Sequence, residues 1–354
     1  MIFRWHTVRM PNENGVKGNP MKHGFMRTSA AVLGAALLGA TCMTSAFAQE
    51  LESVSLRLAW IAGGVDAPIF MADAKGYFAE EGLDVEIVDG NGSTGTIQAV
   101  GTGDFEIGIA GLGALAQAQQ QSGANNIIAV AGLLQKDPTS IISLEGSGIV
   151  EPKDIEGKRL GTDAGNFEDG MIRAFAAAND VDLDLVDIII INGGADRVAL
   201  LNGEVDFING WANPDGDKVN ELSPIEPPLL FADHGVNILG SSVIVSKDYL
   251  AENGDVVTGF LTALQRGKAD VAANPEEALA IFMEARPDSD EAQIALELDV
   301  MPQYEHTAAS EGMPYGAVAE ADLLQTIELL ESYSEMPAGL TPADIYDGSY
   351  LPTE

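Results

Sequence analysis

The sequence predicts an α/β protein built of two similar lobes. Strand and helix patterns alternate from Leu51 to about Gly210, as expected for parallel βαβ units. A break at Pro138 divides this alternation, and the segment after it repeats the order of strand, polar loop and helix seen before it. Each half is therefore expected to form its own sheet.

Strands are predicted where apolar and polar residues alternate, or where short apolar runs are bounded by turn residues. They are Ser53–Trp60, Leu83–Val88, Phe105–Ala110 and Ile127–Leu134 in the first lobe, and Ser140–Leu144, Arg159–Gly161, Val186–Ile191 and Val205–Ile208 in the second. The apolar segment Asn237–Val245 is predicted to return the chain to the first lobe.

Helices are predicted between these strands and throughout the segment from Lys247 onward. The ranges with the clearest signals are Ala67–Lys75, Thr96–Thr102, Phe167–Ala178 and Pro275–Met283. Asn166 is the expected N-cap of the third helix, and Asn274 that of the fourth. The loop Asn91–Thr96 places hydroxyls and backbone N–H groups at a helix start, where they can hold an electronegative ligand group. Simple helix capping by Ser93 or Thr94 explains the same pattern.

Residues 1–48 have the features of a removable leader with a signal peptide. Lys22 and Arg27 precede the apolar run Ala30–Ala40, which is too short to span a bilayer, and Ala46–Ala48 forms a small-x-small cleavage site. Export to the periplasm, with a mature chain beginning at Gln49, is therefore expected. The single cysteine, Cys42, lies within this segment.

Charge excludes several partners. Residues 1–48 hold five of the 18 basic residues and one of the 54 acidic ones, so 13 basic and 53 acidic residues remain, with a formal net charge of −40. Nucleic acid and anionic membrane surfaces are unfavourable partners for such a chain. No apolar run long enough to cross a membrane follows the leader.

Several motifs together resemble the substrate-binding proteins of ABC importers for nitrate, sulfonates, taurine and thiamine-precursor pyrimidines. They are GYFAEEGLDVEI, GTGDFEIGIAG, SGIVEPKDIEGKRLGT, ALLNGEVDFINGW and ALQRGKADVAANPEEAL. The resemblance implies a type II periplasmic binding fold, in which a hinge of two crossing segments joins the lobes and the ligand lies between them. It also implies a membrane permease and its ATPase as partners. We expect lobe 1 at 49–139, lobe 2 at 140–243, and the return to lobe 1 with C-terminal helices at 244–354.

Ligands of open α/β sheets bind beyond the carboxyl ends of the strands, so the loops there supply the candidate site residues. The candidates are Trp60, Asp66, Asn91, Ser93, Thr94, Gly111, Gln135, Asn166, Phe167, Glu168, Asn192, Asn209, Trp211, Asn213 and Asp215. Trp60 could equally pack into a lobe core, and Asp66 could cap a helix. In the pyrimidine-binding branch, the positions matching Asn209–Asp215 hold a glycine, aromatic, Asn and Glu cluster, from which Pro214–Asp215 departs.

The loops that hold these candidates contain acids, amides and aromatic rings but no Lys or Arg. This composition favours a flat heteroaromatic ring with N–H donors, or an amine held by cation–π contact, over an anion. Backbone N–H groups could still bind taurine, an alkanesulfonate or nitrate, which is the alternative ligand class.

An enzyme on the same fold, similar to the pyrimidine synthases of thiamine biosynthesis, is the competing class of function. Beyond residue 48 the chain has only His234 and His306, no cysteine, and no GxSxG motif. We therefore expect a binding protein without catalytic residues, cofactor or metal, and a monomer.

Overall fold

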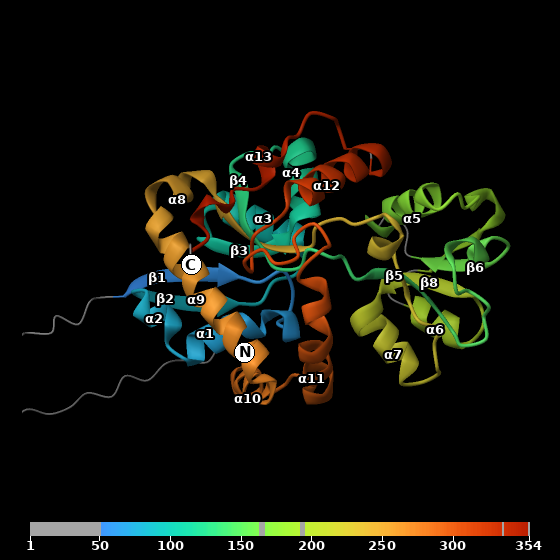
Figure 1. Ribbon diagram of the computed structural model, residues 1–354, viewed down its shortest axis with the longest axis horizontal. Helices are drawn as coiled ribbons and strands as arrows, with labels where there is room; N and C mark the ends of the chain where they lie inside the picture. The colour runs from blue at the N-terminus through green and yellow to red at the C-terminus, as the bar shows by residue number, and fades with distance from the viewer. Residues whose placement is uncertain (1–50, 163–166, 192–194, 335, 353–354) are drawn as a thin grey trace, which may run out of the picture. The chain divides into compact units, whose positions relative to one another are not determined.

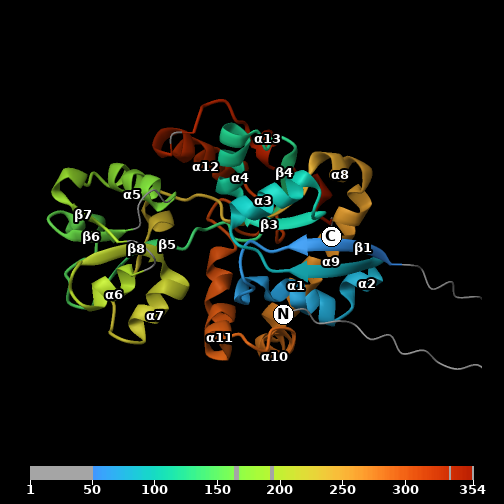
Figure 2. The ribbon, with the colours of Figure 1, turned by 180° about the vertical axis from the view of Figure 1, so that it is seen from behind.

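The chain forms two β-sheets flanked by helices, as Figures 1 and 2 show. The structure is a computed structural model that describes residues 51–162, 167–191, 195–334 and 336–352. Residues 49–354 cluster as a single unit. The predicted leader, residues 1–48, lies outside the described residues.

In the described part of the chain, each sheet has five strands. The first has the order β2-β1-β3-β10-β4, formed by β1 (Glu52–Arg57), β2 (Leu83–Val88), β3 (Ile107–Gly111), β4 (Ile127–Gly132) and β10 (Ser241–Ser246). The second has the order β7-β6-β8-β5-β9, formed by β5 (Thr139–Ser143), β6 (Arg159–Thr162), β7 (Asp187–Ile190), β8 (Phe207–Trp211) and β9 (Leu229–Leu230).

Both sheets are mixed, so the parallel βαβ pattern predicted for Leu51 to about Gly210 was wrong for β5, while the direction of the return strand β10 had not been predicted. β1 pairs in parallel with β2 and β3, and β6 pairs in parallel with β7 and β8. β10 runs antiparallel to β3 and β4, and β5 runs antiparallel to β8. The reason is the direction of entry: β5 and β10 arrive directly from the other sheet, without the crossover helix that a parallel connection needs.

The described helices are α1 (Ala67–Ala74), α2 (Tyr77–Glu80), α3 (Ser93–Thr102), α4 (Leu112–Ser122), α5 (Phe167–Ala178), α6 (Asp196–Leu201), α7 (Asp217–Asn220), α8 (Lys247–Glu252), α9 (Gly254–Ala273), α10 (Pro275–Ala285), α11 (Glu291–Val300), α12 (Glu320–Tyr333) and α13 (Pro342–Ile345). Shorter turns of helix are η1 (Gly64–Asp66), η2 (Pro152–Ile155), η3 (Leu183–Leu185), η4 (Ala212–Gly216), η5 (Phe231–His234), η6 (Met301–Tyr304) and η7 (Gly348–Tyr350).

Two predicted boundaries shift near the site. α3 begins at Ser93 and not at Thr96, so the expected polar loop supplies the first turn of the helix. β1 ends at Arg57, which leaves Trp60 in a bend beyond the strand. The predicted helix start at Pro275 is confirmed, although the side chain of Asn274 makes no capping hydrogen bond.

Alternation along the strands of the first sheet separates two apolar layers. Ile107 and Ile109 of β3 pack in one layer with helices α1, α9 and α10, while Ala110 packs in the other with α3, α4 and α12. In β10, Val243 and Val245 join the first layer and Ile244 the second. This arrangement covers both faces of the sheet with helices, as mainly parallel sheets require.

The second sheet is also covered on both faces. Ile142 and Ile208 pack with residues of α6 and α7 on one face. On the other, Phe175 of α5 stacks on Phe231 with ring centroids 4.5 Å apart, beside Phe207 of β8.

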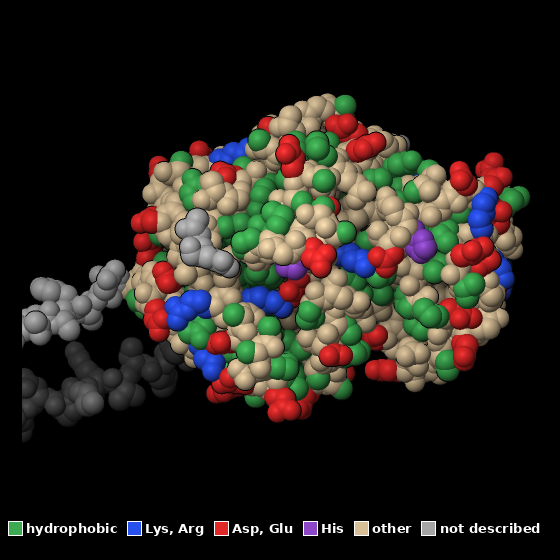
Figure 3. Space-filling view, viewed as in Figure 1, with side chains coloured by type: hydrophobic (Ala, Val, Ile, Leu, Met, Phe, Trp, Pro, Cys, Tyr) green, Lys and Arg blue, Asp and Glu red, His purple; other side chains and the backbone are tan. Residues whose placement is uncertain are grey.

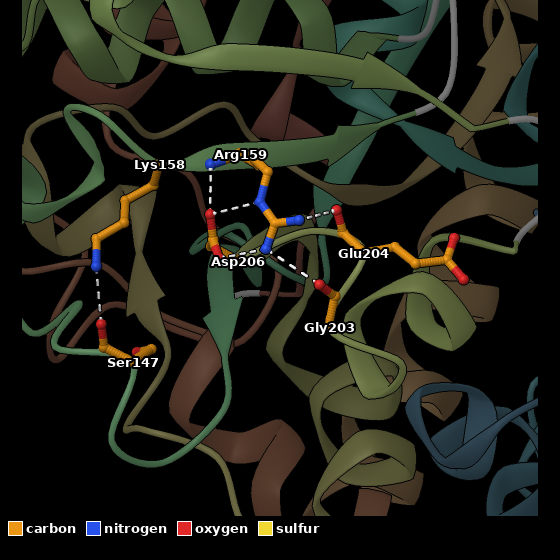
Figure 4. A network of polar contacts seen from close by, with 6 residues as sticks. All are labelled: Ser147, Lys158, Arg159, Gly203, Glu204 and Asp206. Atoms are coloured by element: carbon orange, nitrogen blue, oxygen red, sulfur yellow. Dashed lines mark hydrogen bonds and ion pairs between the residues drawn. The ribbon is translucent and has the colours of Figure 1, made fainter.

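A bidentate ion pair ties the start of β6 to the residue that precedes β8 in the second sheet (Figure 4). The guanidinium of Arg159 donates to both carboxylate oxygens of Asp206, at 3.0 and 2.8 Å, and to the backbone oxygens of Gly203 and Glu204. The neighbouring Lys158 donates to the backbone oxygen of Ser147 at 2.9 Å. These contacts lie at the start of β6, away from the strand ends where ligands bind.

Acidic side chains are spread over the visible face of the molecule and do not form one patch (Figure 3). In the described ranges, no helix combines the length and the hydropathy that crossing a membrane requires. The division of the chain into lobes at 139/140 and 243/244 remains our proposal.

Helices α1 and α9 pack closely against each other through Gly267. A Cβ atom at Gly267 would lie 2.2 Å from the backbone oxygen of Pro68, so only glycine allows this approach. At Gly101 of α3, by contrast, a Cβ would meet only the side chain of Ile127 among the described residues, with its terminal methyl nearest at 3.2 Å.

We therefore expect Gly267→Ala to lower the free energy of unfolding by about 1–3 kcal/mol, because the two helices must separate. Gly101→Ala is the matched control, and it should be neutral or stabilising by up to about 1 kcal/mol through helix propensity. Urea unfolding followed by circular dichroism measures both. Equal free energies for the two variants would contradict the packing argument.

Candidate functional site

A cavity of about 800 Å³ lies at the carboxyl ends of β1, β3 and β8. The described residues that line it are Ala59, Trp60, Gly92, Ser93, Thr94, Gly111, Gly113, Ala114, Gln117, Asp137, Thr139, Trp211, Asp215, Ile238, Leu239, Gly240 and Ser241. The strand-end rule therefore places this cavity correctly, and residues of both sheets contribute to its wall.

The two segments that connect the sheets are hydrogen-bonded to each other beside the cavity. Asn237 is buried; its side-chain N–H donates to the backbone oxygen of Gln135, and its side-chain oxygen accepts from the backbone N–H of Asp137, both at 2.8 Å. The backbone N–H of Gly240 donates to Leu134, and that of Leu134 donates to Ser241, both at 3.0 Å. The crossing segments thus form a fixed part of the cavity wall.

The starts of α3 and α4 both lie at the cavity but differ in their hydrogen bonds. At α4, the backbone N–H groups of Leu112 and Gly113 donate to the backbone oxygens of Gly240 and Leu239, at 2.8 and 3.1 Å. Those donors are therefore already satisfied. The N-cap residue of α3, Gly92, makes no side-chain capping hydrogen bond, and the hydroxyl oxygen of Ser93 accepts from the backbone N–H of Gly111 at 3.0 Å. Ser93 thus joins α3 to the end of β3.

Two tryptophans line the cavity from opposite sheets. Trp60 follows β1 and is 62% exposed, while Trp211 ends β8 and is 38% exposed. Trp60 therefore does not pack into a lobe core, which was the competing interpretation of its position. Exposed indole rings at a cavity provide flat apolar faces for stacking on a ring or for a cation.

Asp215 is the candidate acid that lines this cavity, and its negative charge is balanced by an arginine. Its carboxylate forms an ion pair with Arg197 of α6 at 2.9 Å and accepts from the backbone N–H of Trp211 at 3.2 Å. Arg197 was not predicted from the sequence, because it lies in the first turn of α6 and not in the loop that follows β7. Asp215 therefore holds the backbone of Trp211, and its negative charge is balanced by Arg197.

Four other candidates lie outside the lining. Asn91 accepts from the guanidinium of Arg57 at 3.0 Å, and Gln135 is buried and donates to the backbone oxygen of Ala317 at 2.8 Å. Asn213 accepts from the Tyr304 hydroxyl at 2.7 Å and donates to Asp217 at 2.8 Å.

Asn209 of β8 is the fourth; it is buried, and neither polar atom of its amide has a hydrogen-bond partner among the described residues. Ligand contact by these four residues stays a prediction.

Asp66 is buried at the start of α1 and is also absent from the lining. It accepts from the backbone N–H of Gly63 at 3.0 Å. Burial, with smaller effects of the nearby Glu297 and Asp89, raises the pKa of Asp66 from 3.8 to about 7, against the opposing effects of the Gly63 hydrogen bond and Arg286. Asp66 therefore holds the loop that follows Trp60, through its hydrogen bond with Gly63.

The remaining candidates cannot be placed in the site. Asn166 and Asn192 lie outside the described residues. Phe167 and Glu168 begin α5, but their side chains also lie outside the described part.

A second cavity of about 450 Å³ lies beside the crossing segments. Its lining includes Lys136, Asp233, His306, Thr307 and Asp322. Lys136 pairs with Asp233 at 2.7 Å, and Thr307 donates to Asp322 at 2.6 Å. His234, the other histidine beyond residue 48, packs edge-on against Phe175. Neither histidine lines the larger cavity.

Several residues of the larger cavity were not predicted, among them Gln117, Asp137, Thr139 and the segment 238–241. The apolar segment Asn237–Val245 was recognised as the return of the chain. Its role as cavity wall depends on pairing with residues 133–138, which no local pattern reveals.

A family model described as NMT1/THI5 like matches residues 65–278, which is more than half of the chain. The chain belongs to the NMT1/THI5-like family. The matched range includes β2, β3, the whole second sheet and the crossing segments, so the cavity residues from Gly92 to Ser241 fall within it.

Relatives of this NMT1/THI5-like protein include both binding proteins and enzymes. It is 25% identical to the formylaminopyrimidine-binding protein of Halalkalibacterium halodurans over 267 residues, which cover 72% of this chain and 77% of that protein. It is also 25% identical to the riboflavin-binding protein RibY of Chloroflexus aurantiacus, with 72% of each chain covered. The 4-amino-5-hydroxymethyl-2-methylpyrimidine phosphate synthase of Legionella pneumophila is 26% identical, with 66% of this chain and 74% of that enzyme covered.

Solved structures show the type II periplasmic binding fold. The periplasmic aliphatic sulphonate binding protein SsuA from Escherichia coli aligns with a TM-score of 0.66 and 16% identity, covering 86% of this chain and 94% of that one. The predicted fold class is therefore confirmed.

Replacement of Asp66 by Asn should change how stability depends on pH. Because the folded-state pKa of Asp66 is raised from 3.8 to about 7, its stabilising contribution is complete below pH 3.8 and is lost as the pH rises to about 7. The unfolding free energy of the wild type relative to Asp66→Asn should therefore fall between pH 4 and 7, by up to about 1.4 kcal/mol per pH unit, and level off above pH 7.

Urea unfolding at pH 5, 6, 7 and 8 measures this difference. Asp299→Asn, which alters an exposed acid on α11, is the control and should keep the wild-type pH dependence. A difference between wild type and Asp66→Asn that is the same at every pH would show that Asp66 does not titrate in this range.

Proposed function

We propose that this protein is the solute-binding component of an ABC importer and that it captures a small, flat, pyrimidine-like heteroaromatic ligand. The observation that carries the proposal is the pair of exposed tryptophans, Trp60 and Trp211, on a cavity at the strand ends. The ligand would lie between residues of the two sheets and be delivered to a permease with its ATPase.

Aromatic stacking suits the two indole rings. Large apolar side chains are normally buried in a folded protein, so two exposed tryptophans on one cavity indicate a surface that gains free energy when covered. A flat ring presents the same kind of face, and stacking adds to the energy of burying apolar area. The cavity volume of about 800 Å³ is also within the range of small-molecule sites.

The charges at the cavity favour a ligand without net negative charge. No Lys or Arg occurs among the described residues that line it, and Asp215 is paired with Arg197. A buried anion would need cationic partners or free backbone donors, and the first N–H groups of α4 are already bonded to backbone oxygens. The start of α3, with Ser93 and Thr94, is the place where a polar substituent of the ring would bind.

The names of two relatives support this ligand class, because a formylaminopyrimidine and riboflavin both contain flat nitrogen heterocycles. A binding role is further supported by the positions of His234 and His306, which do not line the cavity. The predicted signal peptide supports a periplasmic location, where an importer component meets its ligand.

A ligand screen tests the proposal. Unfolding and refolding first removes any bound ligand, and thermal shift then compares pyrimidines and riboflavin with taurine, an alkanesulfonate and nitrate. A ring compound should raise the melting temperature in proportion to the logarithm of its concentration above the Kd. A larger shift by taurine or nitrate would contradict the ligand class, and turnover of a pyrimidine precursor with pyridoxal phosphate and iron would contradict the binding role.

Replacing either tryptophan by alanine should weaken the binding of the best ring compound by about tenfold or more, because stacking and apolar burial are lost. The melting temperature of the free protein should change little, since both rings are exposed. Isothermal titration calorimetry measures the Kd of Trp60→Ala and Trp211→Ala.

Ile61→Ala is the matched control for the first of these variants. Ile61 neighbours Trp60 and is 64% exposed, but it does not line the cavity. Its replacement should leave the Kd unchanged. Unaltered binding by both tryptophan variants would remove the aromatic site from the proposal.

A further inference from the structure

The loop that carries Trp60 is bound to three carboxylates through three successive backbone N–H groups. Ala62 donates to Asp89 at 3.2 Å, Gly63 donates to Asp66 at 3.0 Å, and Gly64 donates to Glu297 at 2.5 Å. Asp89 follows β2, Glu297 lies on α11, and Asp66 ends η1, immediately before α1. Two separate elements and the last residue of the turn itself therefore hold this part of the chain.

Glu297 is the most distant of the three acceptors in sequence, and both of its carboxylate oxygens accept hydrogen bonds. Its second carboxylate oxygen accepts from the side-chain amide of Gln293, one helical turn earlier, at 2.9 Å. A Cβ atom at Gly64 would lie 2.5 Å from the Cβ of Glu297, and one at Gly63 would lie 3.0 Å from its carboxylate. The two glycines thus allow α11 to approach the loop closely.

The chain on the other side of Trp60 is also held by hydrogen bonds. The backbone N–H of Gly90 donates to the oxygen of Trp60 at 3.0 Å, and that of Gly92 donates to the oxygen of Ala59 at 2.7 Å. The indole of Trp60 itself is largely exposed. The direction of the ring therefore depends on how firmly the backbone at 59–64 is held.

One cation lies close to this cluster of acids. The guanidinium of Arg286 is 3.5 Å from Asp89 and stacks over Phe70 at 4.9 Å from the ring centroid. The acids that hold the loop therefore outnumber the nearby cation, and they remain in place because each accepts a backbone N–H group.

We propose that Glu297, together with Asp66 and Asp89, is a positioning residue that sets the orientation of Trp60 over the cavity. The effect on affinity rests on the proposed function, whereas the effect on Trp60 itself does not. Trp211 is held in a comparable way, because its backbone N–H donates to the carboxylate of Asp215.

The sequence makes a selective measurement possible. It contains three tryptophans, Trp5, Trp60 and Trp211, so a chain with Trp5→Phe and Trp211→Phe reports fluorescence from Trp60 alone. In that background and without ligand, Glu297→Ala should lower the fluorescence anisotropy of Trp60 and change its quenching by acrylamide. Glu297→Gln, which keeps an acceptor oxygen, should resemble the parent chain.

Affinity for the best ring compound is measured in chains that retain Trp211. Glu297→Ala should raise the Kd about five- to tenfold, and Glu297→Gln should largely restore it. Asp299→Ala removes an exposed acid from the same helix and should alter neither measurement. If Glu297→Ala unfolds at assay temperature, Glu297→Asp provides the test, because its shorter side chain cannot reach the N–H of Gly64 from the same position.

The outcomes separate the two proposals. Unchanged Trp60 anisotropy and quenching in Glu297→Ala and Glu297→Asp would overturn the positioning role, whatever the ligand. Altered Trp60 fluorescence in a protein that binds no ring compound would support the positioning role and overturn the proposed ligand. Equal losses of affinity in the Ala and Gln variants would show that the charge of Glu297, and not its acceptor oxygen, holds the loop that follows Trp60. That result would also contradict the proposal.

Discussion

Hydrogen bonding between the two crossing segments is the constraint on which the site depends. The buried amide of Asn237 satisfies one donor and one acceptor of the segment 135–137, and Gly240 and Ser241 bond to Leu134. The other crossing segment, through Leu239 and Gly240, supplies the backbone oxygens that bond to the first N–H groups of α4. Because unpaired buried backbone groups are costly, this pairing fixes where the chain passes from one sheet to the other. The direction of β5 and β10, and the position of the cavity between their ends, follow from it.

Carboxylates near the site act mainly as acceptors for backbone N–H groups. Asp66, Asp89 and Glu297 bind the loop after Trp60, and Asp215 binds the N–H of Trp211. A chain so rich in acids could be expected to present a strongly negative cavity. These contacts, with the ion pair to Arg197, use several of the acids to orient aromatic rings. The apolar faces of the tryptophans then determine the chemistry that the cavity offers.

Much of the fold could be predicted from local patterns. The alternation in Leu83–Val88 and the helix signals in Ala67–Lys75 and Phe167–Ala178 agree with β2, α1 and α5. The same patterns do not report strand direction, so β5 was wrongly placed among parallel units and the antiparallel direction of β10 was not predicted. The strand-end rule located Trp60, Ser93, Thr94, Gly111, Trp211 and Asp215 on one cavity. It did not separate them from Asp66 and Gln135, because burial depends on elements that are distant in the sequence.

By itself, the sequence determined the α/β class, the two-lobed organisation, the family resemblance and the loops in which a site would lie. Hydrophobic periodicity and turn residues act over a few positions, and these features need no more than that. Only the tertiary structure decided that Arg197 neutralises Asp215, that Glu297 reaches Gly64, and that residues 238–241 form a wall of the cavity. Each of these contacts joins atoms whose positions depend on how separate elements pack, and no local pattern encodes that packing.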